Sequence, residues 1–311
     1  MSGAAPEAAL TVRGLRKRFG RFEALRGLDL TVPRGSIFGL IGPNGAGKTT
    51  TFAIACGFLR PDAGELTLLG ESGFVVRRLK GRLTAMPQDA ALGGEMRCRE
   101  HLLYFAALQG LHGAAAERAA EQALAEVGLL DRAASPARTL SHGMMRRLGI
   151  AQALLGSPEL VLLDEPTNGL DPRHAHELRE LLARHRGQRT LIISSHNLVE
   201  LEQLCDHVAF IDQGAYVGGG AVEAITGRGE VIEVVLGEGA APLAALRAAF
   251  GEAEVTWAEE TRTVRVRFVP GPGRQAEDVM SEVLRVLLGE GARISAARRG
   301  TSLEKRFLEL T

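Results

Sequence analysis

The residues with the most evident chemistry form a glycine-rich stretch, Gly42-Pro43-Asn44-Gly45-Ala46-Gly47-Lys48-Thr49. An apolar run at 37–41 precedes it, and a helical pattern from Thr50 to Phe58 follows it. A phosphate-binding loop needs this order of strand, loop and helix, because backbone N–H groups and the positive end of the helix dipole then face one concavity. Lys48 can reach the β- and γ-phosphates of a nucleotide, and the Thr49 hydroxyl can bind Mg²⁺. A chance match is the alternative, and the order of the elements argues against it.

Two carboxylates, Asp164 and Glu165, follow a continuous apolar run at 160–163. Such a run predicts a strand buried on both faces, and open parallel sheets bind ligands at the carboxyl ends of their strands. A carboxylate there can hold Mg²⁺ directly or through water, and its neighbour can polarise a water molecule. The alternative is a solvated loop after a core strand, and the phosphate-binding loop upstream favours the metal site.

Two further polar residues follow predicted strands. Gln88 ends the strand pattern at 83–88, and His196 follows the buried-strand pattern at 190–195. By themselves, a glutamine and a histidine in such places are most often surface or structural residues. Beside a phosphate site, however, the glutamine can face the ligand and the imidazole can donate a hydrogen bond to the γ-phosphate.

Two other segments also have both a structural and a functional interpretation. Ser141 and Gly143 open a predicted helix, where a small polar residue is usually a cap but also suits an anion site. The basic segment 16–22 contains two aromatic residues and suits a hairpin turn. One of its two rings can instead stack on a nucleotide base. From these residues alone, the cap and the hairpin are the favoured interpretations.

The composition excludes several classes of protein. The chain has 311 residues, and its 37 acidic and 37 basic residues balance, so no overall charge attracts it to nucleic acid or to an anionic membrane. Its three cysteines, Cys56, Cys98 and Cys205, lack metal-binding spacing and suit a reducing compartment. Residues 1–9 have no secretory character, and no apolar run approaches the ~18 residues that cross a bilayer. Any action at a membrane therefore needs a second chain.

The order of the predicted elements indicates an α/β protein in two parts. Strand and helix patterns fill residues 10–227 after a flexible leader at 1–9, with a helical insert at about 90–158. From residue 228 to 311 the order is strand, helix, strand, strand, helix, strand, which fits a small ferredoxin-like α+β domain. The segment Ser302 to Leu308 predicts a capped amphipathic helix.

Taken together, these stretches resemble the ATP-binding cassette (ABC) ATPases over roughly residues 10–220. Six matches in the family's order overturn the structural interpretations of Gln88, Ser141 and His196. The signature departs from the usual Leu-Ser-Gly-Gly-Gln, since here it reads Leu-Ser-His-Gly-Met. The six matches are the phosphate loop at 42–49, the Q-loop Gln88, the signature at 140–144, the acidic motif at 160–165, the D-loop at 168–171 and the switch His196. Phe19 in addition stands at the family's base-stacking position.

The resemblance implies a P-loop NTPase core with an antiparallel β subdomain and a helical subdomain. It implies that Glu165 is the general base for the attacking water, that Gln88 senses the γ-phosphate and that His196 positions it. It implies that Thr49, Gln88 and Asp164 bind Mg²⁺. The ATP-binding residues implied are Phe19, Gly42, Pro43, Asn44, Gly45, Ala46, Gly47, Lys48, Thr49, Thr50, Ser141 and Gly143.

The resemblance also implies partners. ABC ATPases dimerise head to tail, so we expect a homodimer that encloses ATP and Mg²⁺, with no nucleic acid. The ending Ser-Leu-Glu-x-x-Phe-Leu at 302–308 is similar to the ATPase subunits of ABC-2-type bacterial exporters. We therefore predict an ATP-hydrolysing exporter subunit in the cytoplasm, held on the inner face of the membrane by a separate permease. The alternatives are a soluble ABC ATPase of translation or DNA maintenance, and a P-loop kinase or GTPase.

Overall fold

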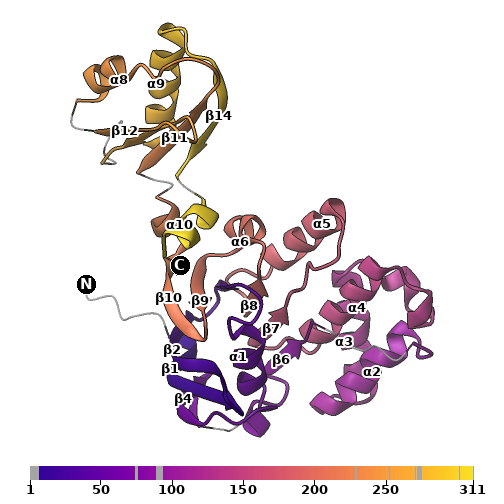
Figure 1. Ribbon diagram of the computed structural model, residues 1–311. Helices are drawn as coiled ribbons and strands as arrows, with labels where there is room; N and C mark the ends of the chain where they lie inside the picture. Colours follow the sequence, from indigo (N-terminus) through magenta and orange to yellow (C-terminus); the bar gives the residue numbers. More distant parts are fainter. Residues whose placement is uncertain are drawn as a thin grey trace. The chain divides into compact units, whose positions relative to one another are not determined.

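The computed structural model describes residues 7–73, 76–88, 94–227, 230–251, 253–269, 271, 275–300 and 302–310. Contacts divide the chain into two compact units between Gly219 and Gly220 (Figure 1). The second unit begins with helix α7 (Val222–Thr226), which packs against α10 (Leu303–Leu310). The sequence predicted a change of domain after residue 227, and these domain limits stay a prediction.

The first unit is built on a six-stranded sheet with the order β10-β9-β3-β8-β7-β6. Strand β3 pairs in parallel with β8 and β9, and β7 pairs in parallel with β6 and β8. Every residue of β3, β7 and β8 is buried, which explains their continuous apolar sequences. The strands are β3 (Ile37–Ile41), β6 (Leu83–Met86), β7 (Leu160–Asp164), β8 (Thr190–Ser195), β9 (His207–Asp212) and β10 (Ala215–Ala221).

The helices of the first unit form two groups. One group, α2 (Cys98–Gln109), α3 (Gly113–Glu126) and α4 (His142–Leu154), packs together as the predicted helical insert, magenta in Figure 1, and α4 contacts β6. The other helices are α1 (Lys48–Ala55), which leads from β3 to the second sheet, α5 (Pro172–Ala183), which connects β7 to β8, and α6 (Leu198–Leu204), which connects β8 to β9. Short 3₁₀ helices lie at Val76–Leu79, Leu130–Arg132 and Ala137–Thr139. In the described part of the chain, every helix is too short or too polar to span a bilayer.

A second sheet of the first unit is antiparallel, with the order β2-β1-β4-β5. It contains β1 (Ala8–Phe19), β2 (Phe22–Pro33), β4 (Ala63–Leu68) and β5 (Glu71–Ser72). The hairpin predicted at 16–22 is present, since β1 and β2 pair as far as Phe19 opposite Phe22. Buried residues of this sheet, such as Leu28, share one apolar cluster with Leu40 of β3 and Ile54 of α1. The predicted antiparallel β subdomain is therefore confirmed.

The second unit has the predicted ferredoxin-like order. Its elements are β11 (Val231–Leu236), α8 (Leu243–Phe250), β12 (Glu254–Ala258), β13 (Thr263–Arg267), α9 (Ala276–Gly289) and β14 (Ile294–Arg299). The strands form an antiparallel sheet with the order β12-β13-β11-β14. Apolar residues of the sheet and of both helices, such as Val234, Leu246 and Val283, form a separate core. Helix α10 follows, and Ser302 caps it by accepting a hydrogen bond from the Lys305 N–H.

One local expectation differs from the structure. Ala8 and Ala9 were assigned to a flexible leader, but they begin β1, and Ala9 is buried because it packs in the apolar cluster. Residues 1–6 lie outside the described residues. Three consecutive glycines at 218–220 lie within β10, and a Cβ on Gly219 would lie 2.4 Å from the Val208 carbonyl oxygen. Gly219 thus allows close approach of two backbones.

A buried carboxylate, Glu233 of β11, joins four segments of the second unit. Its side chain is 1% exposed and accepts hydrogen bonds from Arg265 Nη2 at 2.7 Å and from Arg298 Nη2 at 2.6 Å. Lys305 Nζ of α10 lies 3.5 Å from the same carboxylate. Burial alone would raise the pKa of Glu233, but the hydrogen bonds from Arg298 and Arg265 outweigh burial and hold this pKa below its ordinary value.

We expect Glu233→Gln to destabilise the chain by about 3 kcal/mol at pH 7, because the cations lose their buried counter-charge. Since the folded pKa lies below the ordinary value of 4.5, this stabilisation is present above pH 4.5 and disappears as the pH falls through the folded pKa. Urea unfolding monitored by the fluorescence of Trp257, on β12 of this unit, measures the difference at each pH.

Glu254→Gln is the matched control, because Glu254 is 68% exposed and its partner Arg267 lies 4.0 Å away. Its removal is expected to change the free energy of unfolding by less than about 0.5 kcal/mol. An equal effect of the two substitutions at pH 7 would contradict the role of Glu233.

Candidate nucleotide site

A cavity of about 390 Å³ lies where the carboxyl ends of β3 and β7 meet. Most of the predicted site residues line it: Phe19, Asn44, Gly45, Ala46, Gly47, Lys48, Thr49, Thr50, Gln88, Asp164 and Glu165. Phe22 and Ala24 complete the lining. The predicted Gly42, Pro43 and His196 contact side chains of this lining, whereas Ser141 and Gly143 are not part of it.

The loop between β3 and α1 depends on two glycines. A Cβ on Gly42 would lie 2.2 Å from the Ile211 carbonyl oxygen, and a Cβ on Gly47 would lie 2.7 Å from a methyl group of Leu25. Gly47 also has a φ of 106°, a conformation that side chains rarely permit. Helix α1 begins at the next residue, so its unpaired N–H groups and its positive dipole end face the loop.

The ammonium group of Lys48 is held inside this loop. Its Nζ donates hydrogen bonds to the carbonyl oxygens of Gly42 at 2.7 Å and Pro43 at 3.2 Å, and lies 3.8 Å from Glu165 Oε1. The residue is 6% exposed. Burial lowers the pKa of Lys48, and the nearby carboxylates of Glu165 and Asp164 oppose that shift. A buried cation of this kind suits a polyanionic ligand that enters the loop.

Asp164 sits between two hydroxyl groups. Thr49 Oγ1 donates to Asp164 Oδ2 at 2.9 Å, and Ser194 Oγ donates to the other carboxylate oxygen. The Thr49 hydroxyl and the Asp164 carboxylate are hard oxygen ligands, and Mg²⁺ is typically held by one or two carboxylates together with phosphate oxygens. These residues therefore fit the predicted ion. In the described part of the chain, no cluster of three or more His, Cys, Asp or Glu residues offers a separate metal site.

Glu165 has an unusual backbone. Its φ of 49° lies in the left-handed region, which non-glycine residues adopt only rarely. Its N–H donates to Ser194 Oγ at 3.0 Å, and its Oε2 accepts a hydrogen bond from His196 Nδ1 at 3.0 Å. The carboxylate is 7% exposed, while the imidazole is 55% exposed. The two residues therefore form a pair that reaches from the cavity towards solvent.

Gln88 and the two phenylalanines lie at the rim of the cavity. Gln88 is exposed, and its backbone carbonyl oxygen accepts a hydrogen bond from Arg146 Nη1 at 2.7 Å. Phe19 and Phe22 flank the turn of the β1–β2 hairpin and are 46% and 58% exposed. The hairpin interpretation of this segment is confirmed, and the stacking of a base on Phe19 stays a prediction.

The signature segment begins helix α4. Ser141 caps this helix, because its Oγ accepts a hydrogen bond from the Met144 N–H at 3.3 Å. Gly143 faces residues that follow the D-loop, since a Cβ on it would lie 3.6 Å from the His174 ring. The cap interpretation is thus confirmed, and contact with a phosphate group stays a prediction.

Two contributors to the site were not predicted from the sequence. Ser194 holds both Asp164 and the N–H of Glu165, and Phe22 adds a second ring to the rim. The only signal for Ser194 was a hydroxyl residue at the carboxyl end of a buried strand. Its contact with Asp164 follows from the parallel register that sets these two residues opposite each other.

The phosphate-binding loop after a parallel strand, with two carboxylates at the end of a nearby strand, defines a P-loop nucleotide-hydrolysing protein. Residues 25–168 match the family model described as ABC transporter. The daunorubicin resistance ATP-binding protein DrrA3 of Streptomyces coeruleorubidus is 36% identical over 315 residues, which cover 98% of this chain and 96% of that protein. This chain belongs to the ABC transporter ATP-binding proteins.

Other similarities agree with this family. The Nod factor export ATP-binding protein I of Burkholderia lata is 39% identical over 225 residues, which cover 71% of this chain and 73% of that protein. The solved structure of an ATP-binding subunit of an ABC transporter is 29% identical, with a TM-score of 0.64. The match covers 71% of this chain and 92% of the chain in that structure. The predicted ABC ATPase fold, ATP hydrolysis and exporter type are therefore confirmed, and the relatives named here favour an exporter subunit over a soluble ABC ATPase.

Proposed function

We propose that two copies of this chain enclose Mg·ATP between them and that hydrolysis drives a separate membrane permease. The observation that carries this proposal is the cavity of about 390 Å³, which gathers the phosphate loop, both carboxylates and two aromatic rings. The loop serves to bind the phosphates, one carboxylate to bind the metal ion, the other to accept a proton from water, and the rings to stack on the base.

The loop and its neighbours bind the nucleotide. The N–H groups of residues 44–49 and the Lys48 ammonium contact the phosphates, and Phe19 stacks on the base. Thr49, Asp164 and Gln88 hold Mg²⁺, which when bound supplies positive charge for the oxygens of the terminal phosphate. Ser194 keeps the Asp164 carboxylate in place by donating to its second oxygen.

Glu165 accepts the proton of the attacking water. His196 Nδ1 donates to its Oε2, and Lys48 Nζ lies near its Oε1, so the carboxylate is oriented from both sides. Burial in the cavity keeps this base close to the terminal phosphate. The exposed imidazole of His196 positions the γ-phosphate through its other ring nitrogen, which is free to face the nucleotide.

A second copy completes the site. Within one chain, Ser141 and Gly143 lie outside the cavity, so they are available to a nucleotide bound by the other copy. Helix α4 then adds its N–H groups and its positive dipole end to the side of the γ-phosphate that one phosphate loop leaves open. Loss of that phosphate removes the bridge between the copies, and the dimer opens.

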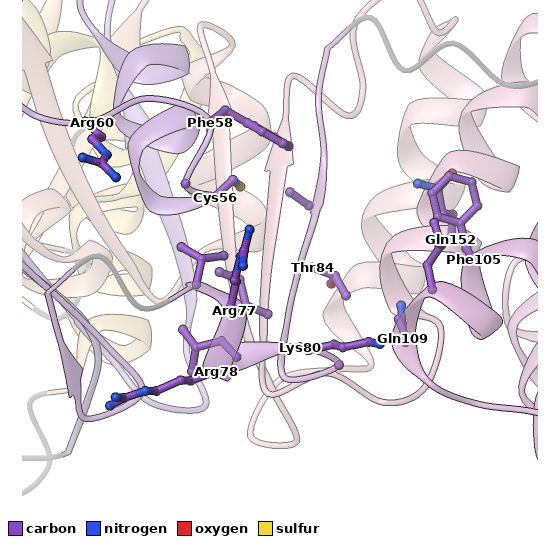
Figure 2. Close-up of a pocket in the computed structure, with 17 residues that line it drawn as sticks. Cys56, Phe58, Arg60, Arg77, Arg78, Lys80, Thr84, Phe105, Gln109 and Gln152 are labelled. Atoms are coloured by element: carbon purple, nitrogen blue, oxygen red, sulfur yellow. The ribbon is translucent and has the colours of Figure 1, made fainter.

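A larger cavity, of about 1220 Å³, is proposed to receive the permease. It lies between the residues that follow α1 and the helices α2 and α4, as Figure 2 shows. Phe58, 78% exposed, and Leu108, 52% exposed, are apolar residues of its lining. Four basic residues, Arg77 and Lys80 among them, and no acidic residue belong to the lining that the structure describes. An amphipathic, acidic segment fits such a surface.

With the permease in this cavity, the chain lies on the cytoplasmic face of the membrane. The permease is proposed to be of the ABC-2 type, because the segment 302–308 has the ending described above. The names of the relatives, daunorubicin resistance and Nod factor export, support the export of a small molecule. The contacts with that molecule belong to the permease.

Fractionation of cells tests this proposal. The tagged full chain is expected in the membrane fraction, together with a polytopic membrane protein. Arg77→Glu combined with Lys80→Glu is expected to move most of it to the supernatant, while ATP hydrolysis by the purified chain changes by less than about twofold, because rim charges govern association. Recovery with ribosomes or DNA would contradict the proposal and favour the soluble alternative.

A further inference from the structure

The signature helix α4 is fixed along strand β6 by two close contacts. Thr84 Oγ1 donates a hydrogen bond to the Ala153 carbonyl oxygen at 2.5 Å. A Cβ on Gly149 would lie 3.1 Å from Met86 Sδ, so Met86 packs directly on the backbone of α4. These contacts hold the helix and the strand at a defined register.

A third contact lies beyond the end of β6, where Arg146 of α4 donates a hydrogen bond to the backbone carbonyl oxygen of Gln88 and leaves the Gln88 side chain available to the nucleotide cavity. Residues 84, 86 and 88 alternate along the chain, so they lie on the same side of the strand and of its extension. Residues 146, 149 and 153 are three or four positions apart, so they lie on one face of the helix. The four steps from residue 84 to residue 88 advance about 13 Å along the strand, and the seven steps from residue 146 to residue 153 advance about 10 Å along the helix. The two lengths are similar, so the three contacts can form side by side.

The contact between Arg146 and Gln88 differs from the other two. Thr84 and Met86 belong to β6 and are at least partly buried, whereas Gln88 is exposed and lies past the end of the strand. Arg146 Nε is buried and has no hydrogen-bond partner among the described residues.

We infer that Arg146 is a positioning residue that ties Gln88 to the signature helix and thereby links the two cavities. Thr84, at one end of the series, lines the larger cavity (Figure 2), and Gln88, at the other end, lines the nucleotide cavity. A shift of α4 along β6 therefore moves the Gln88 carbonyl, and a change at Gln88 pulls on α4. This inference rests on the proposed function, in which Gln88 contacts Mg²⁺ and the γ-phosphate.

Steady-state kinetics of the purified full chain test the inference. Arg146→Met is expected to lower kcat about 10- to 100-fold, because a misplaced catalytic group is costly, while KM for ATP changes by less than about threefold. Arg146→Lys keeps a hydrogen-bond donor on a shorter side chain, so its kcat is expected to lie between those of Arg146→Met and the unmutated chain. Arg138→Met is the matched control, because Arg138 precedes the same helix but pairs with exposed Glu95, and its kcat should stay unchanged.

A double-mutant cycle shows whether Arg146 acts through Gln88. Gln88→Ala alone is expected to lower kcat, and adding Arg146→Met to it should lower kcat by no more than about twofold further, because both changes remove one function. Multiplicative losses would overturn the inference and leave the role of Gln88 intact. Full activity of Gln88→Ala would overturn both that role and the inference. A parallel rise in KM and fall in the unfolding temperature of Arg146→Met would assign Arg146 a merely structural role.

Discussion

Glu165→Gln is expected to lower kcat for ATP hydrolysis by about 10³-fold, because a general base contributes roughly 10²- to 10⁴-fold. The amide keeps the size of the carboxylate and still accepts a hydrogen bond from His196, so ATP binding should be retained. Since the terminal phosphate is not removed, the two copies should remain closed around it. Phosphate release measures the first effect, and sedimentation with and without Mg·ATP measures the second.

The strand that carries Glu165 provides its own control. Glu159 lies just before β7, at the opposite end from Glu165, and pairs with Arg82 at the surface. Glu159→Gln should therefore hydrolyse ATP at the unmutated rate and should not be trapped as a dimer. Hydrolysis by Glu165→Gln at the rate of the unmutated chain would refute the assignment of the base. A chain that stays monomeric with Mg·ATP in the Glu165→Gln variant would refute the proposed dimer.

Lys48→Met is expected to weaken ATP binding by about 100-fold, which corresponds to the roughly 3 kcal/mol that a hydrogen bond to a charged group contributes at most. Hydrolysis at saturating ATP should fall as well, because the Lys48 charge also faces the phosphate oxygens that become more negative during the reaction. Titration with a fluorescent ATP analogue measures the affinity, and phosphate release measures the rate.

Lys48→Met should nevertheless fold. The methionine side chain has a similar length and fills the same space, and escaping the burial that lowers the pKa of Lys48 offsets the loss of its hydrogen bonds to Gly42 and Pro43. The thermal midpoint without nucleotide should therefore be retained. Arg99→Met removes an exposed cation that pairs with Glu117 on a neighbouring helix and should leave ATP binding unchanged. Unaltered ATP affinity in Lys48→Met would contradict the proposed phosphate site.

The sequence predicted the elements that have strong local signals. Strand β8 was predicted at 190–195 and has those bounds, because six consecutive buried residues give an uninterrupted pattern between polar neighbours. The phosphate loop was predicted from its glycines, and the structure shows backbone and side chains that exclude a Cβ at Gly42 and at Gly47. The ferredoxin-like order of the second unit was predicted because its strands alternate in polarity and its helices are amphipathic.

Contacts between distant segments could not be predicted in this way. The hydrogen bond from Ser194 to Asp164 depends on which residues of β7 and β8 lie opposite each other, and neither strand alone contains that register. The contact between Arg146 and Gln88 depends on the position of α4 along β6. The role of Gly219 could not be predicted either, because glycine suits both a chain break and the close approach of two strands that β10 shows.

The strand order of the second unit also bears on how that unit is made in the cell. Strand β11 emerges first from the ribosome, yet both of its neighbours, β13 and β14, are synthesised later, the last about sixty residues behind it. Strand β11 has no partner strand until β13 has been made, and its other edge stays unpaired until β14 follows. This unit should consequently acquire its fold late in translation, and a stalled nascent chain would present a bare β11 to chaperones.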